Sequence, residues 1–206
     1  MTGDATPTNR TVELLEKSVL SDGFFPLVLC KLRHTLFAGG LSRAFTREIL
    51  QRDPVSAVLP YDPVRDTVVL LEQFRAGKML SGAADPWMIE IVAGIMGSDE
   101  TPEEVARREA VEEAGCSIET LEPVADFYPS AGGSSEFVHI FCGKVDSQGL
   151  GGIHGLAQED EDIRVMVTSA DEAMQLVANR KMDNAIAIMA LQWLALNRDR
   201  LRRLWT

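Results

Sequence analysis

The sequence has little cysteine and little histidine, with three residues of each among 206. Cys30, Cys116 and Cys142 are odd in number and unrelated in spacing, so they form neither a disulfide framework nor a CxxC metal pair. We therefore expect free thiols in a reducing compartment. We expect no cluster of histidine and cysteine that would select a soft metal.

Long apolar runs are also missing. Charged residues interrupt the apolar stretches within about a dozen residues, fewer than a membrane-spanning helix requires. Residues 1–10 are polar and lack the basic start and apolar core of a signal peptide. We therefore expect a cytoplasmic protein without membrane contact, in which residues 1–10 form a short disordered leader.

Positive charge is scarce. The chain has 20 lysines and arginines against 31 aspartates and glutamates, a formal net charge of −11. Such a surface repels nucleic acid and anionic membranes, so we expect neither as a partner. An acidic protein that acts on a phosphate substrate needs cations to bridge its carboxylates and the phosphate. The charge balance therefore favours a bound divalent metal.

Alternation of apolar and polar residues predicts a series of strands. Three form an N-terminal antiparallel β-domain over residues 11–52, and more follow in a main domain over residues 53–206. A stretch rich in small residues, 76–85, is predicted to be a mobile loop. The predicted strands before the first helix cover residues 11–20, 24–37, 42–50, 55–60, 67–73 and 87–93. After that helix, strands resume through Phe127 and Phe137 to Val145, and another covers residues 163–168.

The clearest predicted helix begins after Thr101, which supplies a capping hydroxyl, with proline at the first helical position and Glu104 completing a capping box. It ends at Gly115 in a left-handed conformation. A second capping box at 169–172 opens another helix, and a last one begins near residue 183, with an apolar face that fits either the core or a dimer contact. Mixed strands with few helices indicate an α+β fold or an α/β/α sandwich.

Three glutamates of the first helix carry the candidate chemistry. Glu109, Glu112 and Glu113 are three and four residues apart, so they share one helix face. Carboxylates that close repel one another unless a hard cation lies among them. Their spacing alone fits a metal site and a solvated acidic face equally well.

The residues around these glutamates decide between the two interpretations. Five residues separate Gly94 from Glu100, and seven more precede the run Arg108-Glu109-Ala110-Val111-Glu112-Glu113-Ala114-Gly115. This pattern resembles the signature of the Nudix hydrolase family at every polar and glycine position. Ala110 and Cys116 replace bulky aliphatic residues, which affects packing only.

Each matched position has a physical role. Gly94 allows a tight turn from a strand into the loop and brings the main-chain oxygen of Ala93 toward the metal. Glu100 is placed to hold the loop by pairing with Arg108, which orients its neighbours. The resemblance implies that Mg²⁺, or Mn²⁺ as a substitute, is bound by Ala93, Glu109 and Glu113 with Glu112 beside them.

The acidic loop 158–162 is the best source of a general base. Glu159 is the first candidate and Glu161 the second, although a solvent-facing charged loop would have the same composition. The glycine-rich approach at 149–155 suits a loop that closes over a substrate.

Further similarity identifies a subgroup. From about Phe24 onward, the runs 87–94, 132–136, 154–157 and 183–185 resemble bacterial ADP-ribose pyrophosphatases of the Nudix family. The resemblance implies a Nudix α/β/α sandwich preceded by an N-terminal antiparallel β-domain that is exchanged in a homodimer. The implied reaction is Mg²⁺-dependent hydrolysis of ADP-ribose to AMP and ribose 5-phosphate.

The same resemblance implies a set of substrate-binding residues. Phe24 would stack on adenine, Arg47 would reach the substrate from the partner subunit, and Glu136 would contact the ribose end; Arg75 and Ser130 complete the set. The residues alone leave other interpretations open. Phe24 could belong to the core, and either arginine could form a surface salt bridge.

One departure concerns the substrate. The subgroup usually has proline just before the glycine pair 132–133, where this chain has Ala131 and the nearest proline is Pro129. The shift moves the rigid point of the loop. Another nucleoside diphosphate sugar, such as GDP-mannose, is therefore an alternative substrate. A non-catalytic ADP-ribose sensor is a further alternative, which the intact glutamates disfavour.

Overall fold

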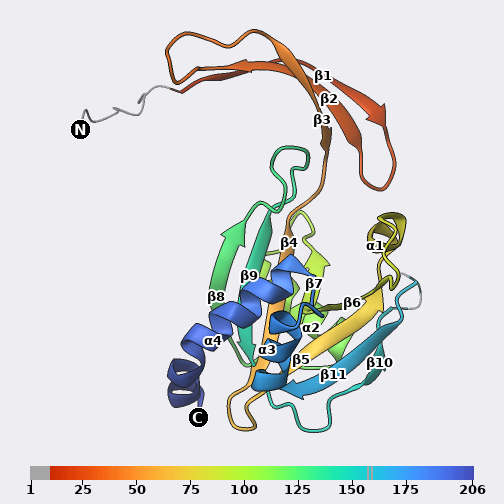
Figure 1. The fold of residues 1–206 in the computed structure, drawn as a ribbon, viewed down its shortest axis with the longest axis vertical. Helices are drawn as coiled ribbons and strands as arrows, with labels where there is room; N and C mark the ends of the chain where they lie inside the picture. The colour runs from red at the N-terminus through yellow and green to blue at the C-terminus, as the bar shows by residue number, and fades with distance from the viewer. Residues whose placement is uncertain (1–9, 157, 159) are drawn as a thin grey trace, which may run out of the picture. The chain divides into compact units, whose positions relative to one another are not determined.

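The computed structural model describes residues 10–156, 158 and 160–206 (Figure 1). The chain divides into two compact units. An N-terminal unit comprises residues up to 53 together with the loop 128–136, and a main unit comprises residues 54–127 and 137–206. None of the helices in the described ranges is both long and apolar enough to cross a membrane.

The N-terminal unit contains a three-stranded antiparallel sheet in the order β1 (Val12–Ser21), β2 (Leu27–His34) and β3 (Phe45–Leu50). Among the described residues of this unit, no helix covers the sheet and Val28 is the one buried apolar residue. A single-layer sheet cannot bury the side chains of its two faces. Large apolar side chains therefore remain exposed at Val12, Leu14, Leu15, Val19, Leu20, Phe24 and Phe37.

The main unit is built on a mixed sheet in the order β10-β11-β5-β4-β9-β8, with β6 added to β5 and β7 added to β4 (Figure 1). The central strand β4 is buried along its whole length and pairs in parallel with β9. The strands are β4 (Val55–Asp62), β5 (Thr67–Phe74), β6 (Trp87–Glu90), β7 (Val92–Ile95), β8 (Thr120–Phe127), β9 (Val138–Lys144), β10 (Gly152–His154) and β11 (Ile163–Ser169).

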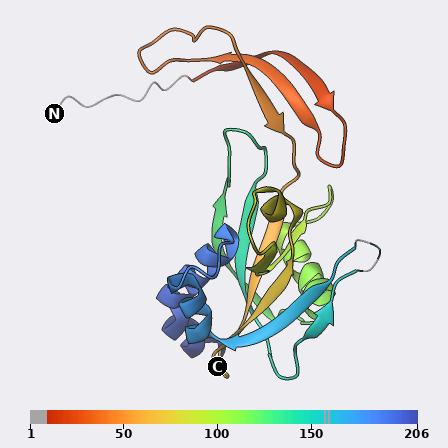
Figure 2. The same ribbon diagram turned by 45° about the vertical axis from the view of Figure 1, so that its right-hand side comes forward.

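Helices cover both faces of this sheet. On one face, Ala57 and Leu59 of β4 share a core with α3 (Ala170–Ala178) and α4 (Ala185–Trp205). On the other face, Val58 packs with the apolar side of α2 (Pro102–Ala114). Figure 2 shows α3 and α4 on one side and α2 on the other. The predicted α+β fold with an α/β/α sandwich is therefore confirmed.

The predicted helix ends are also confirmed. Thr101 and Glu104 form the capping box of α2, and Gly115 ends the helix with φ +61°. Ser169 and Glu172 form the capping box of α3. Helix α4 begins after Asn184. Its apolar face packs in the main core, which was one of the two interpretations of that face; the other was a dimer contact.

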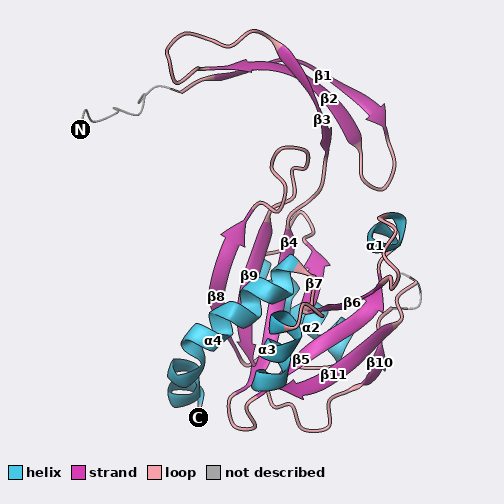
Figure 3. Cartoon of the chain, viewed as in Figure 1, coloured by secondary structure: helices cyan, strands magenta, loops and turns pink. Residues whose placement is uncertain are grey.

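Two local predictions were wrong. The stretch expected to be a loop contains a short helix, α1 (Ala76–Leu80), shown in Figure 3. Lys78 in this helix donates a hydrogen bond to the Trp87 carbonyl oxygen and pairs with Asp183 at 2.9 Å. The single strand expected over 87–93 is two strands that separate at Ile91, because β6 pairs with β5 while β7 pairs with β4.

The turn between β4 and β5 is tied to α4 by Asp66, which has φ +60°. Its carboxylate accepts hydrogen bonds from the Tyr61 hydroxyl at 2.7 Å and from Arg198 Nε at 2.8 Å, and a second oxygen also bonds the Arg198 guanidinium. These bonds, with that from Arg198 the largest influence, hold the pKa of Asp66 below its usual range. Asp66 therefore contributes to stability as the ionised carboxylate.

We expect Asp66→Asn to lower the free energy of unfolding at pH 7 by about 1–3 kcal/mol, because asparagine tolerates positive φ but loses the charge-assisted bonds. The folded-state pKa of Asp66 lies below the unfolded value of about 3.9, so its stabilisation is complete above that value and is lost as the pH falls through the folded pKa. Urea unfolding from pH 7 to pH 3 measures both effects.

Asp146→Asn is the matched control, since Asp146 is exposed and also pairs with an arginine, Arg65. Its effect should stay within about 0.5 kcal/mol. Equal stability of wild type and Asp66→Asn at pH 7 would contradict the anchoring role of Asp66.

Candidate active site

Glu109 and Glu113 of α2 lie against the backbone of β7, and Arg108 bonds Glu109 and Glu112. Glu113 is 3% exposed, and its Oε2 accepts a hydrogen bond from the Ala93 amide nitrogen at 2.9 Å. Arg108 Nη1 donates to Glu109 Oε1 at 2.6 Å and to Glu112 Oε2 at 3.0 Å. The structure therefore brings the predicted carboxylates and Ala93 together at one place.

Gly94 leaves room for the carboxylate of Glu109. A Cβ at this position would lie 1.7 Å from Glu109 Oε1 and 2.1 Å from its Cδ. Gly94 lies inside β7, opposite Ser56 of β4, so the predicted role as a tight turn was wrong. Its absent side chain instead allows the Glu109 carboxylate to rest directly on the strand.

The loop before α2 is held by Glu100, as the sequence predicted. Glu100 accepts hydrogen bonds from Arg108 Nε at 2.8 Å and from Arg108 Nη2 at 3.2 Å. It also accepts one from the Gly97 amide nitrogen at 2.9 Å. The bond from Arg108 is the main reason that the pKa of Glu100 lies below its usual range, and the same pair raises the pKa of Arg108. Arg108 therefore joins the loop to two glutamates of the helix.

Burial makes two carboxylates of α2, those of Glu109 and Glu113, hard to ionise. It raises the pKa of Glu113 to about 8, aided by the charges of Glu109 and Glu161, while the Ala93 amide bond and the charge of Arg75 act in the opposite direction. Burial likewise raises the pKa of Glu109, although Arg108 opposes it. An additional cation would relieve this crowding of negative charge.

The chemistry of these groups fits a hard divalent ion, which prefers carboxylate and carbonyl oxygens. Among the described residues, no group of three or more Asp, Glu, His or Cys side chains is arranged so that it could hold a metal ion. The oxygens of Glu109, Glu112 and Glu113 instead contact Arg108 and the Ala93 amide.

The acidic loop is described in part. Glu159, the first candidate for the base, lies outside the described residues. Glu161 Oε2 accepts a hydrogen bond from the Leu156 amide at 3.1 Å, and a Cβ at Gly155 would lie 2.7 Å from the Cβ of Glu161. Because the charge of Glu161 acts on both Glu109 and Glu113, this loop brings it within electrostatic reach of the cluster.

Arg75 follows β5 and is paired with Glu90 in the main unit. Nε and Nη2 of Arg75 lie 2.9 and 2.7 Å from Glu90 Oε2. Its charge also lowers the pKa of Glu113, so the guanidinium acts on the carboxylate cluster. Arg75 is thus a salt-bridge partner, and its side chain remains 45% exposed.

The other predicted substrate residues belong to the N-terminal unit. Phe24 is 85% exposed, so its interpretation as a core residue was wrong; its ring packs edge-on to Phe25. Arg47 lies over the ring of Phe45. The carbonyl oxygen of Ser130 accepts hydrogen bonds from the Gly133 and Ser134 amides, within the loop that carries Glu136.

Sequence reasoning missed three polar residues around these sites. Arg52 pairs with Glu136 at 3.0 Å and lies over the ring of Phe25, while its Nε is buried without a partner in the described part of the chain. In the main unit, Glu90 accepts a hydrogen bond from Arg75 and another from Asn184. Glu90 and Asn184 lie in runs that carried the family resemblance, but only their position in space indicates a partner.

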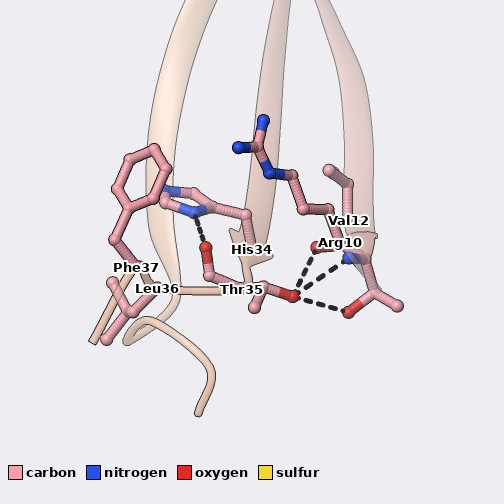
Figure 4. Close-up of a pocket in the computed structure, with 7 residues that line it drawn as sticks. Arg10, Val12, His34, Thr35, Leu36 and Phe37 are labelled. Atoms are coloured by element: carbon pink, nitrogen blue, oxygen red, sulfur yellow. Dashed lines mark hydrogen bonds between the residues drawn. The ribbon is translucent and has the colours of Figure 1, made fainter. Parts of the chain in front are cut away.

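A pocket of about 280 Å³ lies at one end of the N-terminal sheet (Figure 4). None of the predicted site residues lines it. Thr35 and Thr11 exchange hydrogen bonds there, and the Arg10 guanidinium lies over the Phe37 ring. These contacts hold the ends of two strands together.

The α/β/α sandwich and the glutamates gathered on one face of α2 agree with the class of protein that the signature predicted, a Nudix hydrolase. Residues 51–191 match the family model described as the NUDIX domain. The chain belongs to the Nudix family, whose members typically depend on divalent metals.

The similarity to known proteins covers almost the whole chain. It is 46% identical to an ADP-ribose pyrophosphatase of Escherichia coli (strain K12), over 94% of this chain and 92% of that protein. It is 34% identical to a GDP-mannose pyrophosphatase of Cronobacter sakazakii, over 90% and 95% respectively. A crystal structure of an ADP compounds hydrolase shares the fold with a TM-score of 0.67 at 17% identity, over 94% of this chain and 95% of that one.

We expect Gly94→Ala to displace the Glu109 side chain and to lower hydrolytic activity at least about a hundredfold. The contact involves a side chain and Gly94 does not have positive φ, so the midpoint of thermal unfolding should fall by no more than about 5 °C. Initial rates with Mg²⁺ and thermal unfolding measure the two effects.

Gly77→Ala is the control, because a Cβ there would meet nothing within 4 Å. Wild-type rates in Gly94→Ala would show that activity does not depend on the position of the Glu109 carboxylate against β7.

Proposed function

We propose that this protein hydrolyses the diphosphate of ADP-ribose to AMP and ribose 5-phosphate with Mg²⁺, and that Mn²⁺ can substitute. The observation that carries this proposal is the 46% identity to an ADP-ribose pyrophosphatase over nearly the full length of both chains. The complete set Glu109, Glu112 and Glu113 supports catalysis over a sensor that only binds.

In the proposed site, Glu109, Glu113 and the main-chain oxygen of Ala93 hold the metal, with Glu112 beside them. When bound, Mg²⁺ would neutralise charge on the diphosphate oxygens. Arg108 keeps Glu109 and Glu112 oriented through hydrogen bonds of 2.6 and 3.0 Å. Their fixed direction reduces the rearrangement needed when the charged substrate enters.

The proposed chemical step consumes one water molecule. Its oxygen forms a bond to one phosphorus, and the bond from that phosphorus to the bridging oxygen breaks. Glu159 takes the proton from the water, and Glu161 is the second candidate for this role. Crowded carboxylates repel one another, which favours a base that readily accepts a proton.

Substrate recognition is proposed for residues of both units. Phe24, exposed at 85%, offers its ring for stacking on adenine. Glu136 would contact the ribose end and Ser130 would contribute beside it. Arg47 and Arg75 would contact the charged part of the substrate.

We also propose a homodimer in which the N-terminal β-domain, residues 11–52, is exchanged onto the partner's main domain, residues 53–206. The large apolar side chains that the single-layer sheet leaves exposed support this arrangement. In the dimer, Arg47 would reach the substrate bound by the partner.

The first test is incubation with Mg²⁺ and a panel of nucleoside diphosphate sugars. We expect ADP-ribose to give AMP and ribose 5-phosphate with the highest kcat/KM. GDP-mannose is the second candidate, favoured by the 34% identity to a GDP-mannose pyrophosphatase and by Ala131. Faster turnover of GDP-mannose would reject the proposed substrate, and tight ADP-ribose binding without AMP release would reject catalysis.

Glu113→Gln supplies the control for this panel. It keeps the shape of the side chain but removes a charged metal ligand, so most turnover should be lost with fold and dimer intact. Unchanged turnover would place the metal elsewhere.

The base is tested by comparing two variants of the acidic loop. Glu159→Gln should lower kcat about a hundredfold or more, within the usual range for loss of a general base. Metal affinity, measured by Mn²⁺ titration, should change much less. A larger loss of kcat in Glu161→Gln would transfer the role of base to Glu161.

A further inference from the structure

Glu90 is a buried carboxylate that the proposed reaction does not use. It lies at the end of β6, is 6% exposed, and has partners for both oxygens. Oε2 accepts a hydrogen bond from Arg75 Nε at 2.9 Å and lies 2.7 Å from Nη2, while Oε1 accepts one from Asn184 Nδ2 at 2.8 Å. A buried carboxylate is costly unless it is paired in this way.

Asn184 fixes Glu90 relative to the core. Its Oδ1 accepts a hydrogen bond from the Ala187 amide and caps α4, while its Nδ2 donates to Glu90. One amide group therefore serves the helix and the carboxylate together. Because α4 packs along the main core, the position of Glu90 is set by a rigid element.

The segment that carries Arg75 is anchored to the same neighbours. The Arg75 amide donates to the Pro86 carbonyl oxygen at 3.1 Å. Lys78, in the following helix α1, donates to the Trp87 carbonyl oxygen and pairs with Asp183. Backbone and side chain of Arg75 are thus both held against β6 and the start of α4.

This anchor matters because Arg75 faces a strongly acidic neighbourhood. Its charge acts on Glu113, as do those of Glu109 and Glu161. Without a fixed partner, a flexible guanidinium would be drawn toward those carboxylates. Glu90 holds Nε and Nη2, and leaves Nη1 with no partner among the described residues.

We propose that Glu90 is a positioning residue that holds Arg75 in the orientation in which it binds the diphosphate of the substrate, and that Asn184 fixes Glu90. The inference rests on the proposed function, in which Arg75 contacts the substrate. A guanidinium fixed before binding loses less freedom when the substrate arrives, so its contact contributes more to affinity.

The test is a double-mutant cycle with Glu90→Gln, Arg75→Ala and both together. ADP-ribose binding is measured by calorimetry in EDTA, where turnover is suppressed, and kcat and KM are measured with Mg²⁺. Glu90→Gln should raise Kd and KM at least about tenfold, as loss of a charge-assisted contact does, with kcat changed less than about threefold. In the Arg75→Ala background, Glu90→Gln should have no further effect on binding.

Two further variants keep the result interpretable. Glu122→Gln removes a carboxylate paired with Arg200 between β8 and α4 and should leave Kd and KM unchanged. Asn184→Ser keeps a helix cap but is too short to reach Glu90, so it should weaken binding in the same direction. If Glu90→Gln does not fold, the same cycle is measured with Asn184→Ser, in the wild type and in Arg75→Ala.

Equal effects of Glu90→Gln with and without Arg75 would assign Glu90 a structural role and overturn the inference, as would wild-type binding in Glu90→Gln. Turnover of GDP-mannose instead of ADP-ribose would reject only the proposed substrate, and the same cycle with GDP-mannose would then test Glu90. If the protein neither binds nor hydrolyses either compound, both proposals are overturned.

Discussion

Repulsion among the carboxylates of α2 is the constraint around which the main unit is organised. Glu109, Glu112 and Glu113 occupy one helix face, and burial adds to the energy needed to keep Glu109 and Glu113 charged. Arg108 offsets part of this repulsion because its guanidinium binds two of them together with Glu100. A helix with three acidic side chains on one face is stable only if its ends are capped and its apolar face is packed.

Those features are present in α2. The capping box satisfies the first turn, and Gly115 ends the helix where a Cβ would lie 2.6 Å from the ring of His154 on β10. The apolar face buries Ala106, Ala110 and Ala114 against β4 and β5, so small side chains let the helix lie close to the sheet. Ala110, which departs from the usual family pattern, belongs to this close contact.

The sequence revealed features that depend on neighbours along the chain. Both capping boxes, Gly115 and the pairing of Glu100 with Arg108 follow from short spacings on a helix or loop. The division of the strand at Ile91 could not be predicted, because it depends on which distant strand each half joins. The link from Arg75 through Glu90 to Asn184 spans more than a hundred residues, a separation for which spacing gives no signal. Gly94 was identified correctly for the wrong reason, since only three dimensions place Glu109 against it.

The alanine that replaces a proline in the loop of the N-terminal unit has less influence on rigidity than its sequence suggested. The loop closes on itself where Gly133 donates a hydrogen bond to the Ser130 carbonyl oxygen. It is also fixed to the end of β3, since Leu50 donates to the Gly133 carbonyl oxygen and accepts from the Ser135 amide. A proline at position 131 would restrict one φ angle of a loop that these bonds already hold on both sides. Ala131 is therefore a weak argument against ADP-ribose. Beside the loop, Arg52 pairs with Glu136 and lies over the ring of Phe25, so these contacts fix the proposed ribose contact Glu136 independently of residue 131.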